Sequence, residues 1–122
     1  SCYDADLKEK LLGVDKWLIE NYTPESMEVT RAIAIGLKTL IPADIHIGVT
    51  GLTSPGGSET ADKPVGTMFV YACSGTELIF SRRLNFSGSR KDIVTGTVSR
   101  CAELLLAYLI SKQTPYESSP EQ

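Results

Sequence analysis

Four glycines, Gly48, Gly51, Gly56 and Gly57, lie close together after the start of a short apolar run at Ile45. Because glycine has no Cβ, the backbone amides at such positions can approach a ligand closely. A strand that leads into a glycine-rich loop is a common way for an α/β protein to bind an anion or a phosphate group. These residues are therefore the first candidates for a binding site.

The hydroxyl groups of Thr50 and Ser54, together with the glycine amides, are the candidate hydrogen-bond donors of this loop. The alternative is a plain surface connection between two strands. We favour a functional loop, because long connections without secondary structure in small domains often carry function. The loop has neither the Gly-Lys-Ser or Gly-Lys-Thr ending of a Walker loop nor the Gly-x-Gly-x-x-Gly spacing of a dinucleotide fold.

Three further residues could take part in chemistry. Arg90 stands where a Ser-Gly-Ser turn enters the last expected helix, where a guanidinium would strengthen an anion site although the helix dipole disfavours a cation. Tyr3 and Lys8 flank the start of the first expected helix. A lysine whose pKa is lowered by burial can serve as a general base toward a serine hydroxyl. The alternative for Arg90 and Lys8 is a solvated surface side chain.

Size and composition narrow the class of protein. The 122 residues, 42% hydrophobic and 22% charged, suit one globular domain. A net charge of −3 argues against direct nucleic-acid binding, and no unbroken apolar run approaches the length of a membrane span. Three widely spaced cysteines predict free thiols and a cytoplasmic location. The single histidine, His46, argues against a metal site.

Apolar periodicity and turn residues predict the elements that must position these groups. We expect helices over 6–12, 24–40 and 90–111, with Thr23 as the N-cap of the second. Three strands are expected over 45–49, 67–73 and 77–86, the last two forming a hairpin. The ordered domain would cover 1–112, and the tail over 113–122, rich in proline, serine and acidic residues, would be disordered. So small a sheet has an open edge, which would pair with a missing segment or with another subunit, and a homodimer is expected.

Read in order, these signals resemble the C-terminal domain of the CinA (competence/damage-inducible) family. The matching segments are YDADLK at 3–8, LLGV at 11–14, GVTGLTSPGG at 48–57, KPVGT at 63–67 and RRLNFSGSR at 82–90. The resemblance covers residues 1 to about 111. It implies an α/β fold, a three-layer α/β/α sandwich that lacks its first strand and the helices following it.

Family members are known as nicotinamide-nucleotide amidohydrolases. The resemblance therefore implies hydrolysis of the carboxamide of nicotinamide mononucleotide to nicotinate mononucleotide and ammonia, without a cofactor. By position, Lys8 looks like the family's base and Tyr3 like the tyrosine beside it. The implied substrate-binding residues are Thr50 and Gly51, the loop residues Ser54, Gly56 and Gly57, and Arg90, which would hold the phosphate.

The sequence departs from the family pattern at two places. The family's nucleophilic serine lies in a Ser-Cys-Thr-Gly-Gly segment upstream of the tyrosine, whereas Ser1-Cys2 lies directly against Tyr3. We expect either a fragment of a longer protein or a shortened homologue, and these residues alone should not catalyse by the family route. The alternative is a catalytically silent nucleotide-binding or interaction module in a competence or DNA-damage context. Thr53-Ser54 also replace a small Ala-Gly pair, which would narrow the pocket or change its substrate.

Overall fold

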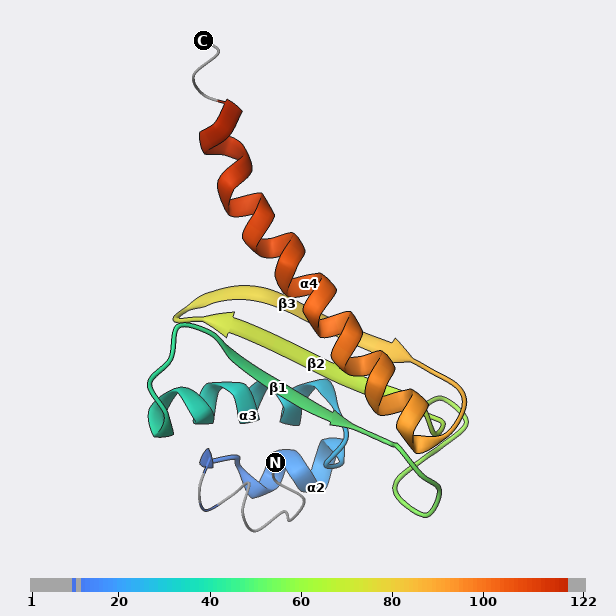
Figure 1. Cartoon of the computed structure of the whole chain (residues 1–122). Coiled ribbons are helices and arrows are strands. Elements are labelled where there is room, and N and C mark those ends of the chain that lie inside the picture. Colours follow the sequence, from blue (N-terminus) through green and yellow to red (C-terminus); the bar gives the residue numbers. More distant parts are fainter. Residues whose placement is uncertain (1–9, 11, 119–122) are drawn as a thin grey trace.

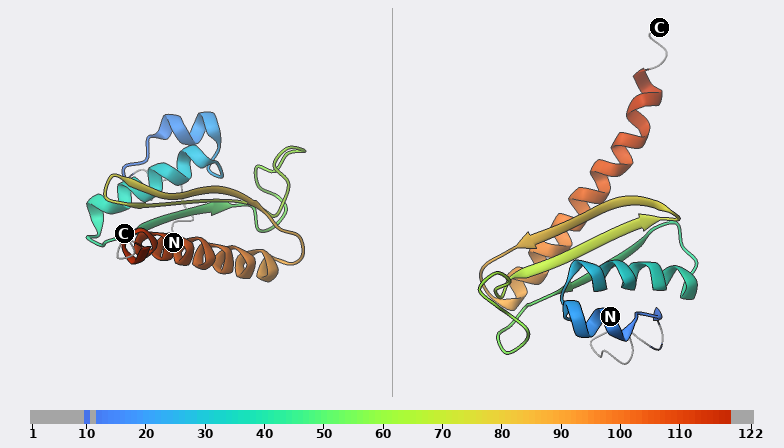
Figure 2. Two further views of the ribbon diagram at one scale, coloured as in Figure 1. Left: turned by 90° about the horizontal axis from the view of Figure 1, so that it is seen from above. Right: turned by 180° about the vertical axis from the view of Figure 1, so that it is seen from behind.

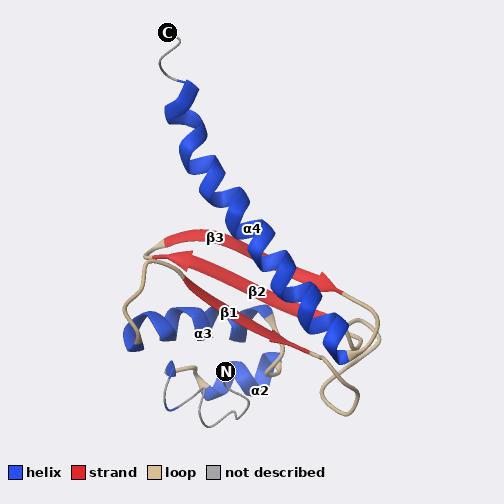
Figure 3. Cartoon of the chain, viewed as in Figure 1, coloured by secondary structure: helices blue, strands red, loops and turns tan. Residues whose placement is uncertain are grey.

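The chain folds into a small antiparallel sheet between two layers of helices (Figure 1). The structure is a computed structural model, which describes residues 10 and 12–118 and the side chains up to residue 113. The elements are α2 (Lys16–Tyr22), α3 (Met27–Leu40), β1 (His46–Gly51), β2 (Thr67–Ser74), β3 (Glu77–Asn85) and α4 (Arg90–Ser118). Helices α2 and α3 cover one face of the sheet and α4 crosses the other (Figures 1 and 2). Figure 3 shows the resulting α/β/α layers. The helix expected over 6–12 lies almost wholly outside the described residues.

The sheet has the order β1-β2-β3, and both strand pairs are antiparallel. The expected β2–β3 hairpin is confirmed, and β2 is central and nearly all buried, as its apolar sequence predicts. Gly51 at the end of β1 pairs with Met68, and Thr67 pairs with Asn85 at the end of β3. The connection over 52–66 and the turn before α4 therefore leave the sheet at the same end.

Helix α3 begins three residues later than expected, at Met27 rather than at residue 24. Ser26 is the N-cap, and its hydroxyl accepts a hydrogen bond of 3.3 Å from the amide of Val29. Thr23 instead follows α2 as its C-cap, with φ at +69°, a backbone conformation that β-branched residues rarely adopt. Both Thr23 and Ser26 have the residue type of a cap, so the sequence alone favoured the wrong one.

Helix α3 packs directly on β1. Thr30 and Ala34 are fully buried at this contact. A side chain at Gly48 would collide with the backbone carbonyl oxygen of Thr30, so the absence of a Cβ lets helix and strand approach. His46 is buried in the same strand, and its Nε2 donates to the Ile41 carbonyl oxygen at 2.6 Å. The single histidine therefore helps to hold the α3–β1 connection.

Helix α4 is longer than the sequence predicts. It continues to Ser118, past the expected end at Ser111, so residues 113–118 are helical rather than disordered. Residues Arg90–Gln113 also have the length and hydropathy of a membrane span, by those two criteria alone. The sequence contains no long unbroken apolar run because serine, threonine and charged residues interrupt it, but the average over a longer window is high.

The N-terminal half of α4 packs on the sheet. Ile93 and Thr97 are buried, and Cys101 contacts the cluster around Phe80. Further along, Glu77 of β3 accepts hydrogen bonds from the Lys112 ammonium at 2.8 Å and the Tyr108 hydroxyl at 3.1 Å. The Lys112 contact is the main reason that the pKa of the Glu77 carboxyl lies below its ordinary value. Cys73 and Cys101 are free thiols, as expected, and Cys2 lies outside the described residues.

Candidate functional site

The connection between β1 and β2 is a closed loop rather than an open excursion. At its base, the Leu52 amide donates to the Thr67 carbonyl oxygen at 2.9 Å, and the Gly66 amide donates to the Leu52 carbonyl oxygen at 2.7 Å. Gly66 has φ at +101°, which glycine adopts without strain. These bonds extend the pairing of β1 and β2 and fix where the loop leaves the sheet.

The glycine amides of this loop bind a carboxylate of the chain itself. The amides of Gly56 and Gly57 donate to the two carboxylate oxygens of Glu59, each at 2.8 Å. Gly56 has φ at +97°, which turns its amide toward the same point as that of Gly57. The hydrogen bonds, with that from Gly56 the largest contribution, lower the pKa of the Glu59 carboxyl. The loop therefore presents two converging donors to an anion, as its glycine content predicts.

The far half of the loop is fastened to the connection between α2 and α3. The Lys63 ammonium donates to the Thr23 hydroxyl oxygen at 2.6 Å and to the Glu25 carbonyl oxygen at 2.8 Å. The Ser58 hydroxyl donates to the Glu25 carboxylate. Sequence reasoning included Lys63 in the KPVGT segment but gave it no role. Its contacts link the loop to the unusual backbone at Thr23, which local sequence patterns do not reveal.

Thr50 is buried at the end of β1, beneath α3. The Thr30 hydroxyl donates to the Ser26 carbonyl oxygen at 2.5 Å, so its single proton is already used. The Thr30 and Thr50 hydroxyl oxygens lie 2.8 Å apart, and Thr50 must therefore be the donor of that bond. In this arrangement Thr50 can accept a hydrogen bond from a ligand, but it has no proton left to donate.

The other predicted loop residues differ in their surroundings. Gly51 is half-buried, and a Cβ there would collide with the Met68 sulfur, so packing explains this glycine. Ser54 is exposed near the loop tip, as are the neighbouring Gly56 and Gly57. The structure thus brings Thr50, Gly51 and the glycine amides into one strand-and-loop unit, with Thr50 buried at its base and the amides at its surface.

Arg90 begins α4 at the same end of the sheet but on the opposite face from the loop (Figure 2). Its side chain is exposed. The Ser89 amide and hydroxyl both donate to the Asp92 carboxylate, at 2.9 and 3.0 Å, and the Asp92 amide donates back to the Ser89 hydroxyl at 3.2 Å. This capping box engages the amides of Ser89 and Asp92 at the helix start. The described contacts do not join Arg90 to the glycine loop, and Tyr3 and Lys8 lie outside the described residues.

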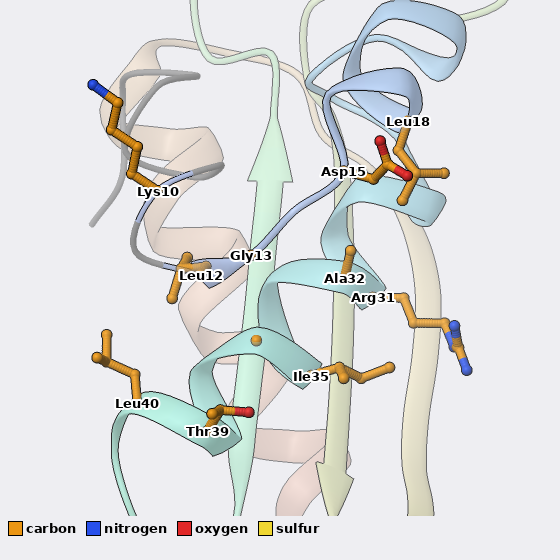
Figure 4. A pocket seen from close by; sticks show the side chains of 11 residues that line it. Lys10, Leu12, Gly13, Asp15, Leu18, Arg31, Ala32, Ile35, Thr39 and Leu40 are labelled. Carbon is orange, nitrogen blue, oxygen red and sulfur yellow. The ribbon is translucent and has the colours of Figure 1, made fainter.

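A separate groove of about 590 Å³ lies between the segment before α2 and helix α3. Figure 4 shows apolar side chains such as Leu12 and Ile35 along it, with the charged Lys10, Asp15 and Arg31 at its margin. None of the predicted substrate-binding residues lines this groove. Within residues 10 and 12–118, no three histidine, cysteine or acidic side chains gather where a metal ion could bind.

The glycine loop, the strand before it and the layered sheet match one known family. The family model of the CinA C-terminal domain matches residues 1–109. This chain belongs to that family. CinA relatives include a putative competence-damage inducible protein of Desulforudis audaxviator, 34% identical over 107 residues, and a CinA-like protein of Endomicrobium trichonymphae, 36% identical over 112 residues.

Solved CinA structures share the fold. The competence/damage inducible protein CihA from Agrobacterium tumefaciens superposes with a TM-score of 0.80 at 26% identity, over 88% of this chain and 65% of that one. A competence or damage-inducible protein from Enterobacter asburiae gives 0.78 at 28% identity, over 88% and 67%. The matches to the two relatives cover 88% and 92% of this chain but only 25% and 26% of the relatives. The chain therefore spans about a quarter of their length.

Proposed function

We propose that this CinA domain belongs to an amidohydrolase that converts nicotinamide mononucleotide to nicotinate mononucleotide and ammonia. The observation that carries the proposal is the pair of converging amides at Gly56 and Gly57, which already hold a carboxylate. An anionic group of a nucleotide has the oxygens that such amides bind. The proposal places the protein in pyridine-nucleotide salvage in the cytoplasm, without a cofactor.

Most of the candidate residues have a distinct part in the proposed reaction. The glycine loop with Ser54 binds the substrate, and Thr50 and Gly51 lie beside it. Arg90, which begins α4 on the opposite face of the sheet from the loop (Figure 2), has no part at this site. Lys8 is the general base that takes the proton from a serine hydroxyl as its oxygen attacks the carboxamide carbon, and Tyr3 lies beside that base. The protonated Lys8 gives this proton to the amide nitrogen, which leaves as ammonia as the C–N bond breaks, and water then hydrolyses the resulting acyl-serine ester to release the carboxylate product. The serine would come from a segment for which this sequence has no counterpart before Tyr3.

The test is ammonia release from nicotinamide mononucleotide by the complete gene product. Lys8→Ala should lower kcat by a factor on the order of 100 or more while KM changes little, because a general base acts in the transition state. Lys10→Ala is the matched control, since Lys10 is an exposed lysine two positions away. Turnover that is equal in the two variants removes Lys8 from this role, and a complete protein that releases no ammonia refutes the activity.

The second candidate is a catalytically silent nucleotide-binding or interaction module. The specific observation in its favour is the altered loop, in which Thr53-Ser54 replace a small Ala-Gly pair of the family pattern. The names of the relatives suggest a competence or DNA-damage setting for it, although direct DNA contact has no support from the net charge of −3. Calorimetry with the mononucleotide separates the cases, because binding without turnover indicates a sensor and no binding indicates a purely structural module.

A further inference from the structure

The carboxylate of Glu59 occupies the donors that the glycine loop offers to an anion. One of its oxygens accepts from Gly56 and the other from Gly57, both at 2.8 Å. Two parallel hydrogen bonds of this kind match the geometry of a carboxylate or a phosphate oxygen pair equally well. A ligand anion that binds these amides must therefore first displace Glu59.

Glu59 is held by backbone amides and by no cation in the described part of the chain. The two ion pairs there are Arg100–Glu103 and Lys112–Glu77, both far from the loop in sequence. Lys63, the nearest lysine along the chain, is occupied by its two bonds to the α2–α3 connection. The Arg83 guanidinium donates to the Asp62 carbonyl oxygen instead. A side chain with these contacts alone can swing into solvent without leaving a charge unpaired in the interior.

The parts of the loop on either side of Gly56 and Gly57 stay anchored when Glu59 moves. Lys63 and Ser58 fasten it to the α2–α3 connection, and the bonds between Leu52, Gly66 and Thr67 close its base. The Thr60 and Lys63 backbones also pair with each other, at 2.9 and 3.1 Å. The amides of Gly56 and Gly57 would therefore remain available to a ligand without a larger rearrangement.

We propose that Glu59 is a built-in competitor of the anionic ligand. Its side chain occupies the two glycine amides when no ligand is bound, and it thereby weakens the apparent affinity of the site for a phosphate group. This inference rests on the proposed function only in the identity of the ligand. At neutral pH the carboxylate is ionised, since hydrogen bonding lowers its pKa, and it competes at full charge. A ligand without an anionic group gains nothing from these amides and does not need to displace Glu59.

The experiment uses inorganic phosphate as the probe and amide NMR as the readout. In the wild type, phosphate should shift the amide resonances of Gly56 and Gly57 and, over the same concentration range, move the Glu59 side-chain carboxyl resonance toward that of a free glutamate. Glu59→Gln should bind phosphate about tenfold more tightly, because a neutral amide competes less strongly for charged hydrogen bonding. Asp62→Asn removes the same charge from an exposed position of the loop and should change the Kd by less than about twofold.

Several outcomes overturn the inference. Equal phosphate affinity in the wild type and Glu59→Gln does so, as does a shift of the glycine amides without any movement of the Glu59 carboxyl resonance. The wild-type measurement remains decisive if the substitution rearranges the loop.

Nicotinamide mononucleotide and nicotinamide riboside, which lacks the phosphate, separate the two proposals. Phosphate binding that is tighter in Glu59→Gln, with no mononucleotide binding, keeps the role of Glu59 and counts against the amidase. Mononucleotide binding that leaves the amide resonances of Gly56 and Gly57 unshifted keeps the amidase and counts against the role of Glu59.

Discussion

Thr30 and Thr50 form a buried pair of hydroxyls in which the direction of each hydrogen bond is fixed. Thr30 donates to the Ser26 carbonyl oxygen, which can only accept, so Thr50 donates to Thr30. The Ser26 N-cap of α3, the helix above β1 and the strand end that leads into the glycine loop are thereby connected. A substitution in this pair therefore alters the contacts of the strand end from which the loop leaves the sheet.

The order of these bonds makes the two valine substitutions unequal. Thr50→Val removes a donor and leaves Thr30 still bonded to Ser26, so it should reduce the free energy of unfolding by about 1 kcal/mol. Thr30→Val leaves the buried Thr50 proton without its acceptor and should cost roughly 2 kcal/mol. Urea denaturation of both variants measures the difference. Equal losses, or a larger loss for Thr50→Val, would contradict the assigned direction.

At the level of elements, Lys63 should decide how rigid the glycine loop is. Lys63→Met keeps most of the side chain's volume but loses two hydrogen bonds to the α2–α3 connection. We expect hydrogen exchange at the Thr60 and Lys63 amides to accelerate by a factor on the order of ten, because charged donors contribute most to such local stability. Lys91→Met, an exposed lysine on α4, should leave these rates unchanged. Unchanged exchange in Lys63→Met would mean that the loop is held without it.

The sequence predicts the strands and the glycine loop well but not the contacts that fasten the loop. Alternating or continuous apolar residues place β1, β2 and β3 to within about two residues. The anchor depends on Lys63 meeting Thr23, forty positions away along the chain, and no local pattern contains that information. The same long-range contact accompanies the misassigned cap of α3. Glu59 was also missed, although an acid two or three positions after paired glycines is a signal that could have identified it.

For the whole molecule, helix α4 presents apolar side chains on more than the side that packs on the sheet. Ile93 and Thr97 face inward, whereas Val98 is 64% exposed and Leu106 is 58% exposed. A helix with apolar residues on nearly all sides has no unique face, so its sequence alone does not show which side packs on the sheet. Such a helix is normally buried on each apolar side in its working assembly.

The exposed stripe of α4 suits a second copy of the chain. Val94, Val98, Leu106 and Leu109 recur at helical spacing and carry no charge, so the stripe is complementary to itself across a two-fold axis. Next to it, Arg100 and Glu103 neutralise each other at 3.1 Å. We therefore expect the 122-residue chain to form a homodimer through this face. The solved CihA chain, of which this chain covers 65%, offers the competing possibility that another part of the domain covers the same stripe.

Sedimentation velocity on the 122-residue chain distinguishes these possibilities. The double variant Val98→Glu/Leu106→Glu should raise the dimer Kd at least about a hundredfold, because two carboxylates would lose their water in an apolar contact. Ser99→Glu adds one carboxylate at an exposed position beside the stripe and should change the Kd much less. A wild-type chain that stays monomeric at high micromolar concentration would contradict the homodimer. Because exposure of an apolar stripe to water costs free energy, that result would indicate that the remainder of the CinA domain packs against the stripe.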